Sequence, residues 1–199
     1  FGGINYYPRF DTNFEKYYPK GIENGLHGKR VREFCQDNQG ILWIGTEDGG
    51  LNRFNPKTKT FSFFTPSNAF TNVHGLCLVD DNLWVGTYAE GLHVLNLKTG
   101  NIKSYTYSRN IPNTLCSNDV LSLFKDRKGE IFIGTSWGLC RYNPQSDNFI
   151  TVINVGAMAS VTDIYEDMYN NLWVATSNSG VFRYNTVNLS LIHISEPTR

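Results

Sequence analysis

The sequence has no excess of charge of either sign and no long hydrophobic run. Its 199 residues include 18 basic and 18 acidic side chains, so the formal net charge is zero. Nucleic acids and anionic membrane surfaces both attract proteins with a basic footprint, and the balanced charge argues against either as the main partner. No apolar stretch approaches the roughly 20 residues of a transmembrane helix.

Recognisable catalytic and metal-binding motifs are also lacking. The sequence contains no G-x-S-x-G, H-E-x-x-H or phosphate-loop motif. Its histidines have no metal-ligand spacing, and its four cysteines form no C-x-x-C pair. Within residues 1–188 these are His27, His74 and His93, and Cys35, Cys77, Cys116 and Cys140. We therefore predict no metal, no cofactor and no catalytic residue in this chain.

A five-residue phrase, by contrast, occurs four times. It reads LWIGT at 42–46, LWVGT at 83–87, IFIGT at 131–135 and LWVAT at 172–176, and its aromatic position recurs after 41, 48 and 41 residues. A repeat of roughly 40–50 residues built from short strands is typical of the blades of a β-propeller. The chain is therefore predicted to be an array of similar units.

Each repeat contains four predicted strands, which in the first complete repeat cover 31–35, 41–46, 51–54 and 60–64. The first connection has Asp37 and Gly40, which favour a tight turn. The third has Asn55 and Pro56, and proline cannot continue a strand ladder. Four antiparallel strands per repeat form a propeller blade, so the predicted fold class is all-β.

The repeats divide residues 1–188 into an incomplete arc of about four blades. We expect 1–19 to supply the end of one blade, 20–66, 67–107 and 108–153 to form three whole blades, and 154–188 to give three strands of another. The sequence is expected to start inside a repeat, because residues 2–7 match residues 49–54. Residues 189–199 break the pattern, resemble a translated sequencing-library adapter, and are predicted not to be native.

The repeated aromatic and glycine positions are predicted to be structural. Large rings fill the wedge between neighbouring blades, and a following glycine lets adjacent backbones approach closely. The residues in this group are Trp43, Gly45, Trp84, Gly86, Phe132, Gly134 and Trp173. The repeated Asp37, Asp126 and Asp167 are likewise assigned to turns, because a catalytic acid is normally unique.

The cysteines are expected to be free and mostly buried. Cys35 and Cys77 hold the same position in adjacent repeats. Sheets packed face to face lie about 10 Å apart, whereas a disulfide tolerates Cα separations of at most about 7 Å.

Variation between the repeats is concentrated in the connections after the second and fourth strands, which emerge at one end of the blade. A rigid scaffold with variable loops at one end is expected to bind ligands there. The candidate residues are His27, Arg30, Glu47, Asp48, His74, Tyr88, Glu90, Asn118, Trp137 and Asn178. Trp137 is the sharpest candidate, because exposed aromatic rings can stack on sugars. Alternatively, these side chains cap the barrel or pack on a neighbouring domain.

The blade sequence from Val31 to Thr58, with its D-x-x-G-x-L-W-I-G-T core, resembles the two-component regulator propeller repeat. Asn118 to Gly129 resembles it as well, and the resemblance covers nearly all of 1–188. The departures are Phe132 in place of tryptophan, Ala175 in place of glycine, and a less polar segment around 155–158.

This resemblance implies the periplasmic sensor region of a Bacteroidetes hybrid two-component histidine kinase. Such proteins have two seven-bladed propellers, an immunoglobulin-like domain, a membrane helix, a kinase core and usually receiver and DNA-binding domains that complete a phosphorelay. The resemblance further implies an oligosaccharide ligand and a homodimer formed through the whole ectodomain. Membrane contact is expected only through a helix downstream, and this stretch itself is expected to be neither an enzyme nor a nucleic-acid binder.

Two other function classes remain open. The first is a protein-binding scaffold propeller, although the Gly-His and Trp-Asp motifs of WD repeats are missing. The second is a secreted propeller lyase or glycosidase. That class requires a unique acid or histidine pair in the loops, and His27 with Glu47 is the one candidate pair.

Overall fold

The computed structural model describes residues 15, 17, 24–64, 70–154 and 159–194. Most of the predicted partial blade 1–19 lies outside these ranges. So do residues 65–69 and 155–158, near two of the predicted boundaries between blades. Within the described residues every regular element is a β-strand, and none forms a helix of the length and hydrophobicity that crossing a membrane requires.

Sixteen strands form four antiparallel sheets of four strands each. Blade 1 consists of β1 (Val31–Gln36), β2 (Leu42–Thr46), β3 (Gly50–Asn55) and β4 (Thr60–Phe64). Blade 2 consists of β5 (Val73–Val79), β6 (Asn82–Thr87), β7 (Gly91–Asn96) and β8 (Ile102–Tyr105). Blade 3 consists of β9 (Val120–Lys125), β10 (Ile131–Thr135), β11 (Gly138–Asn143) and β12 (Asn148–Asn154). Blade 4 consists of β13 (Val161–Glu166), β14 (Asn171–Thr176), β15 (Val181–Asn185) and β16 (Leu191–Ile194).

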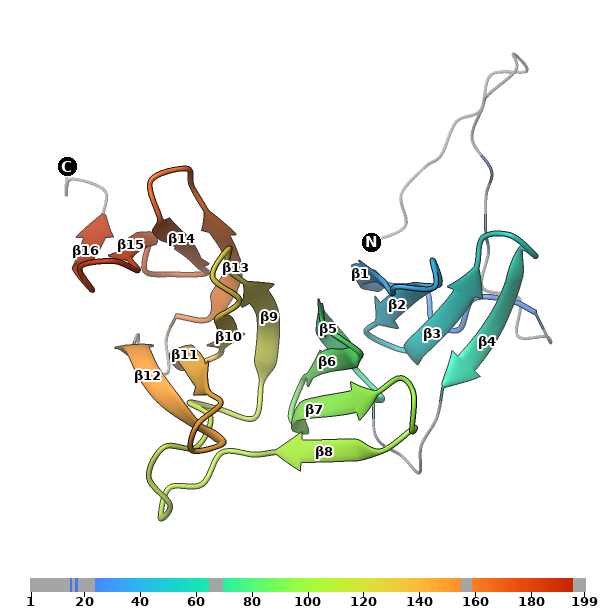
Figure 1. Cartoon of the computed structure of the whole chain (residues 1–199), viewed down its shortest axis with the longest axis horizontal. Coiled ribbons are helices and arrows are strands. Elements are labelled where there is room, and N and C mark those ends of the chain that lie inside the picture. The colour runs from blue at the N-terminus through green and yellow to red at the C-terminus, as the bar shows by residue number, and fades with distance from the viewer. Residues whose placement is uncertain (1–14, 16, 18–23, 65–69, 155–158, 195–199) are drawn as a thin grey trace.

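The four sheets radiate from their first strands to form an open arc (Figure 1). β1, β5, β9 and β13 line the inner side and contact one another in sequence, whereas β4, β8, β12 and β16 lie on the outer rim. This arrangement confirms the predicted all-β propeller arc of about four blades.

In blade 4, β13, β14 and β15 lie within residues 154–188, from which three strands are predicted, and β16 lies within residues 189–199. β16 pairs with β15, with Tyr184 opposite Leu191 and Val181 opposite Ile194. Backbone pairing at an open sheet edge needs only a short β-prone segment, and three of the four β16 residues are Leu or Ile. All four are exposed, so this strand adds no buried core. The non-native origin of 189–199 stays a prediction.

The hydrophobic core lies between the blades. Trp43 of blade 1 packs with Val73 and Leu76 of blade 2. The equivalent rings, Trp84 and Phe132, join the clusters that blades 2 and 3, and blades 3 and 4, form with each other. These three rings are almost fully buried, whereas Trp173 of blade 4 is half-buried. The repeated aromatic position therefore holds consecutive sheets together.

The repeated glycine after this aromatic position makes room for the next blade. A Cβ atom on Gly45 would lie 2.6 Å from Val73 Cγ1. On Gly86 it would lie 2.5 Å from Val120 Cγ1. These separations are far shorter than a van der Waals contact, so any side chain would push the next inner strand away.

The repeated aspartates organise the turns after the first strands. Asp37 accepts hydrogen bonds from the backbone N–H groups of Gln39 and Ile41 through Oδ1, and from Trp43 Nε1 at 2.9 Å through Oδ2. Asp167 does the same in blade 4, with Trp173 Nε1 at 2.8 Å. The column is structural in both blades.

The expectation of four free thiols is wrong for one pair. Cys116 and Cys140 form a disulfide with a Cα–Cα distance of 6.4 Å, whereas Cys35 and Cys77 are free. The separation of about 10 Å used for that expectation applies to cysteines on two sheets packed face to face. Cys116, however, lies in the connection that precedes β9, and this connection folds back over β11 of its own blade, where Cys140 is buried.

Candidate functional site

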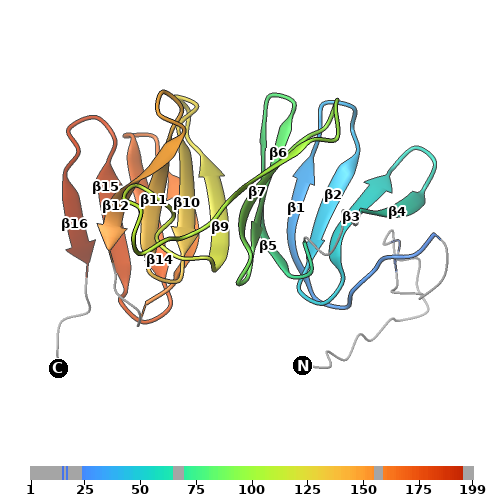
Figure 2. The same cartoon turned by 90° about the horizontal axis from the view of Figure 1, so that it is seen from below.

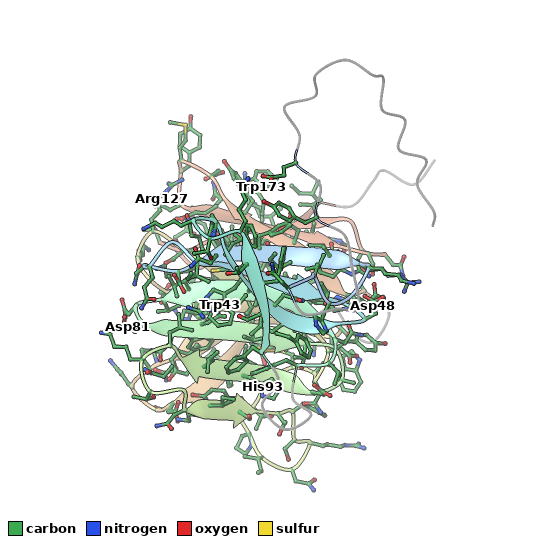
Figure 3. All side chains as sticks on the ribbon, turned by 90° about the vertical axis from the view of Figure 1, so that its right-hand side faces the viewer. Trp43, Asp48, Asp81, His93, Arg127 and Trp173 are labelled. Carbon is green, nitrogen blue, oxygen red and sulfur yellow. A yellow bond between two sulfur atoms is a disulfide. The ribbon has the colours of Figure 1, made fainter. Side chains whose placement is uncertain are left out.

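The two ends of the blades form two different faces (Figure 2). We call the end with the connections after the first and third strands the turn face, and the opposite end the loop face. Asp48 of the loop face lies on one side of the molecule, and Asp81 and Arg127 of the turn face lie on the other (Figure 3). All ten candidate residues belong to connections, or to strand ends, at the loop face.

A repeated hydrogen bond joins the two kinds of loop on this face. The N–H of Glu47 donates to the carbonyl of Arg30, and the N–H of Tyr88 donates to that of Asn72. Blades 3 and 4 repeat the bond between Ser136 and Asp119, and between Ser177 and Ser160. Each inter-blade connection is thereby held beside the loop between the second and third strands of its blade.

In blade 1 the candidate side chains mainly contact other residues of the same blade. Asp48 Oδ1 accepts the N–H groups of Lys29 and Arg30 at 2.8 and 3.2 Å. Glu47 pairs with Arg30 at 3.5 Å and with Arg32 at 2.8 Å. His27 stacks its ring on Phe63, with centroids 4.4 Å apart. His27 and Glu47, the pair considered for an enzyme, therefore have separate structural partners.

A second group lies on blade 2. The rings of His74 and Tyr88 are 5.9 Å apart, and Tyr88 is exposed. Burial and the nearby Arg32 guanidinium lower the pKa of His74, which favours the neutral ring. Glu90 accepts a hydrogen bond from Thr71 at 3.0 Å. This group offers a neutral imidazole beside an exposed phenol.

The third group, in blade 3, includes the sharpest candidate. Trp137 is 43% exposed and contacts Tyr107 edge to face, with ring centroids 5.4 Å apart. Asn118 accepts the Tyr107 N–H at 2.7 Å, so its side chain positions that tyrosine. Asn178 is exposed in the corresponding loop of blade 4.

A pocket of about 360 Å³ opens beside Trp137 and is called the Trp137 pocket below. Its walls combine two aromatic rings with hydroxyl, amide and guanidinium groups. The lining residues are Tyr107, Ser108, Arg109, Ile111, Asn113, Thr114, Leu115, Cys116, Trp137, Thr151 and Asn154. Aromatic faces beside a few convergent polar groups are typical of small-molecule sites.

The connection that forms most of this pocket is held at several points. Ser108 N–H donates to Thr114 Oγ1 at 3.1 Å, and Phe149 N–H donates to the Asn113 carbonyl at 2.9 Å. The Cys116–Cys140 disulfide ties the end of the connection to β11. These anchors fix the backbone, so the pocket is formed before any ligand arrives.

A larger hollow of about 650 Å³ lies between blades 2 and 3 toward the turn face. The tyrosine hydroxyls of its aromatic wall already have hydrogen-bond partners within the protein. Tyr105 and Tyr142 both donate their hydroxyls to Asp147, at 2.6 and 2.9 Å, and Lys103 also pairs with Asp147. The Lys103 ammonium and these hydroxyls hold the pKa of Asp147 down, to about 2. We therefore favour the smaller Trp137 pocket.

Sequence reasoning missed Tyr107, Arg109 and Arg32. Tyr107 and Arg109 lie at the start of the long connection between β8 and β9, where an aromatic residue and a cation were the available signal. Arg32 escaped notice because it lies inside a predicted strand.

Arg32 occupies a β-bulge that recurs in all four inner strands. Val31 pairs with Thr46 and Glu33 with Gly45, so that Arg32 has no partner residue on β2. The residues at this position are Arg32, His74, Leu121 and Thr162. Bulges re-aim side chains and are frequent beside functional sites.

Within the described part of the chain, no group of three or more His, Cys, Asp and Glu side chains is placed to hold a metal. The loop face is therefore characterised by aromatic rings, hydrogen-bonding groups and paired charges.

A family model described as the two component regulator propeller matches residues 25–48, 114–137 and 157–178. The chain carries two-component regulator propeller repeats. Each matched segment contains a first strand, its turn and a second strand, which confirms the family predicted from the sequence.

Two known proteins are similar to this chain over most of its length. Histidine kinase P4 of Formosa agariphila is 29% identical over 188 residues, which are 89% of this chain and 14% of that protein. The extracellular domain assigned to a hybrid two-component system of B. thetaiotaomicron has a TM-score of 0.66 and 21% identity, over 90% of this chain and 29% of that one. The chain thus spans a small part of these relatives.

The same propeller repeat geometry also occurs in an enzyme. An inactive variant of virginiamycin B lyase from Staphylococcus aureus has a TM-score of 0.63 and 17% identity, over 89% of this chain and 59% of that one. At identities below 25% such likenesses show the fold alone.

Proposed function

We propose that this chain is part of the periplasmic sensor region of a hybrid two-component histidine kinase and contributes an oligosaccharide-binding site, the Trp137 pocket. The propeller repeats and the extracellular domains with the same fold support the sensor role. The ligand class rests on the pocket itself, and kinase activity belongs to parts of the protein outside these residues.

One observation carries the proposal. The Trp137 ring is exposed at a pocket whose other walls are rich in hydrogen-bonding groups. A pyranose ring has an apolar face of C–H groups and a rim of hydroxyls, so it matches an aromatic surface flanked by amides and hydroxyls. The pocket is anchored on a rigid blade, so little ordering opposes binding.

The disulfide supports an extracytoplasmic location. Cys116–Cys140 joins a pocket-lining residue to β11. Disulfides form and persist in oxidising compartments such as the bacterial periplasm and are rare in the cytosol.

Signalling in this proposal is a shift between two arrangements of a homodimer. A ligand moves such an equilibrium only to the extent that it binds one arrangement more tightly than the other. The Trp137 pocket must therefore differ in accessibility or shape between the two dimer states.

The first test is binding of oligosaccharides to Trp137→Ala. Oligosaccharides of galactose, xylose and galacturonic acid are titrated by calorimetry into the 199-residue chain and into the variant. We expect a sugar that binds the parent to bind Trp137→Ala at least about tenfold more weakly, since about 1.4 kcal/mol of stacking and desolvation is lost.

The matched control is Tyr169→Ala, which removes a more exposed aromatic ring from the turn face of blade 4. Its affinity should equal that of the parent. Equal affinities of the parent and Trp137→Ala, with both folded by circular dichroism, would contradict the proposed site.

A further inference from the structure

We infer that the Trp137 pocket selects sugars that carry an oxyanion, a carboxylate or a sulfate, and that Arg109 is the residue that recognises this group. The inference rests on the proposed function and adds the ligand subclass to it.

The charge of the pocket is the first argument. Among its lining residues Arg109 is the one with a permanent charge, and no aspartate or glutamate is among them. The chain as a whole has zero net charge, so this local positive excess belongs to the pocket rather than to the overall composition.

The second argument is that the guanidinium of Arg109 has no carboxylate partner among the described residues. The other arginines of the loop face, Arg30 and Arg32, both pair with Glu47. On the turn side of blade 3, Arg141 pairs with Glu130 at 2.7 Å. Arg109 is exposed and keeps all five N–H donors for another group.

Hydrogen bonds on either side of Arg109 hold its backbone in place. Ser108, directly before it, is bonded to Thr114, and the carbonyl of Asn113 accepts the N–H of Phe149. Arg109 therefore starts from a fixed turn beside Trp137 and Tyr107. Binding an anion restricts only its side chain.

The chemistry follows from these three observations. The sugar ring stacks on Trp137, while the guanidinium donates two parallel hydrogen bonds to a carboxylate or sulfate on that ring. Asn113 and Thr151 line the same pocket and can bond the ring hydroxyls. A neutral sugar retains the stacking but leaves the guanidinium in water.

The experiment compares three probes of equal length: a galactose trimer, a galacturonic acid trimer and a sulfated galactose trimer. Each is titrated into the 199-residue chain at 50 and 500 mM NaCl. We expect one or both anionic trimers to bind at least about tenfold more tightly than the neutral trimer at low salt, and the advantage to shrink at high salt. The two anionic arms separate carboxylate from sulfate recognition.

Two variants assign the effect to Arg109. Arg109→Gln should weaken binding of the anionic trimer at least about tenfold more than binding of the neutral trimer. Arg109→Lys should retain part of the advantage of the anionic trimer, because a lysine keeps the charge without the two-pronged geometry. Arg53→Gln, which removes another exposed arginine from β3, should change neither.

The outcomes separate the inference from the proposed function. Equal binding of neutral and anionic trimers by the parent, or an equal loss of both in Arg109→Gln, overturns the inference while oligosaccharide binding stands. Absence of binding by all three trimers to the folded chain counts against both.

Discussion

On the turn face, Asp37, Asp126 and Asp167 each accept the same two backbone N–H groups of their own turn. On the loop face, Asp48 accepts the N–H groups of Lys29 and Arg30 within blade 1. Asp119 instead accepts Ala89 N–H of blade 2 and the Ser136 hydroxyl of blade 3. Blades 1, 3 and 4 thus share one aspartate-centred turn on the turn face, whereas on the loop face the side-chain contacts differ between blades and one backbone hydrogen bond recurs. Ligand specificity can therefore depend on the side chains of the loop face, where the blades differ.

Two blades depart from this turn: in blade 2 only Asp80 and Asp81 separate β5 from β6, and in blade 3 the aromatic residue differs. Phe132 replaces the tryptophan of blades 1 and 4, so no indole N–H reaches Asp126. The Oδ2 atom of Asp126 is buried and has no hydrogen-bond partner among the described residues. The turn itself is unchanged, which shows that the two backbone hydrogen bonds are enough to form it.

The largest expected difference between the faces concerns two tryptophans. Trp43→Ala should lower the free energy of unfolding by about 3–5 kcal/mol, because it leaves a cavity between blades 1 and 2. Trp137→Ala should lower it by less than about 0.5–1 kcal/mol, because the ring is largely at the surface. Urea denaturation of both variants measures this. Similar losses would show that Trp137 is a packing residue.

A smaller difference should separate two aspartates of the turn face. In Asp37→Asn the side-chain NH2 group replaces one acceptor oxygen, so it must face another donor, either the Trp43 indole N–H or the turn N–H groups. The free energy of unfolding should therefore fall by about 1–3 kcal/mol. In Asp126→Asn the amide nitrogen takes the place of the unpartnered Oδ2, so the free energy of unfolding should fall by less than about 1 kcal/mol. Urea denaturation compares the two, and a larger loss in Asp126→Asn would refute the indole argument.

The smallest effect is the response of the turn face to acid. Burial opposes ionisation of Asp167, but hydrogen bonds from Asn171 and the Trp173 indole outweigh it and hold the pKa of this carboxyl well below its ordinary value. A lowered folded-state pKa contributes stability above the ordinary pKa of about 3.9, and this contribution is lost as the pH falls toward the folded-state pKa.

Urea midpoints measured from pH 5 to pH 2 test this prediction. The parent should lose stability over this range, and Asp167→Asn should lose less, because it has no carboxylate to protonate. Parallel pH profiles of the two proteins would contradict it.

The blade pattern could be predicted from sequence because it depends on local chemistry that recurs. Asp37, Gly40 and Trp43 specify a turn and a packing ring, and the strand boundaries followed to within one or two residues. The disulfide could not be predicted in this way. It depends on where one long connection folds, and the path of the residues before Cys116 is not encoded in the repeat.

The candidate site was predicted in part for the same reason. Trp137 stands out because it breaks the repeat pattern. Its neighbours in space, Tyr107 and Arg109, come from the preceding inter-blade connection, and the fold of that connection brings them together. Conversely, Glu47 and Asp48 looked available in sequence, yet the arginine side chains and loop N–H groups of their own blade occupy them.

The recurring bulge in the inner strands affects how freely this protein can change its sequence. A residue without a partner across the ladder can be replaced without disturbing strand pairing, and here that position is occupied by Arg32, His74, Leu121 and Thr162. A cation, an imidazole, an aliphatic chain and a hydroxyl are all accepted. Duplicated blades can therefore diversify their inner strands at this one position, while the pairing of the strands is kept.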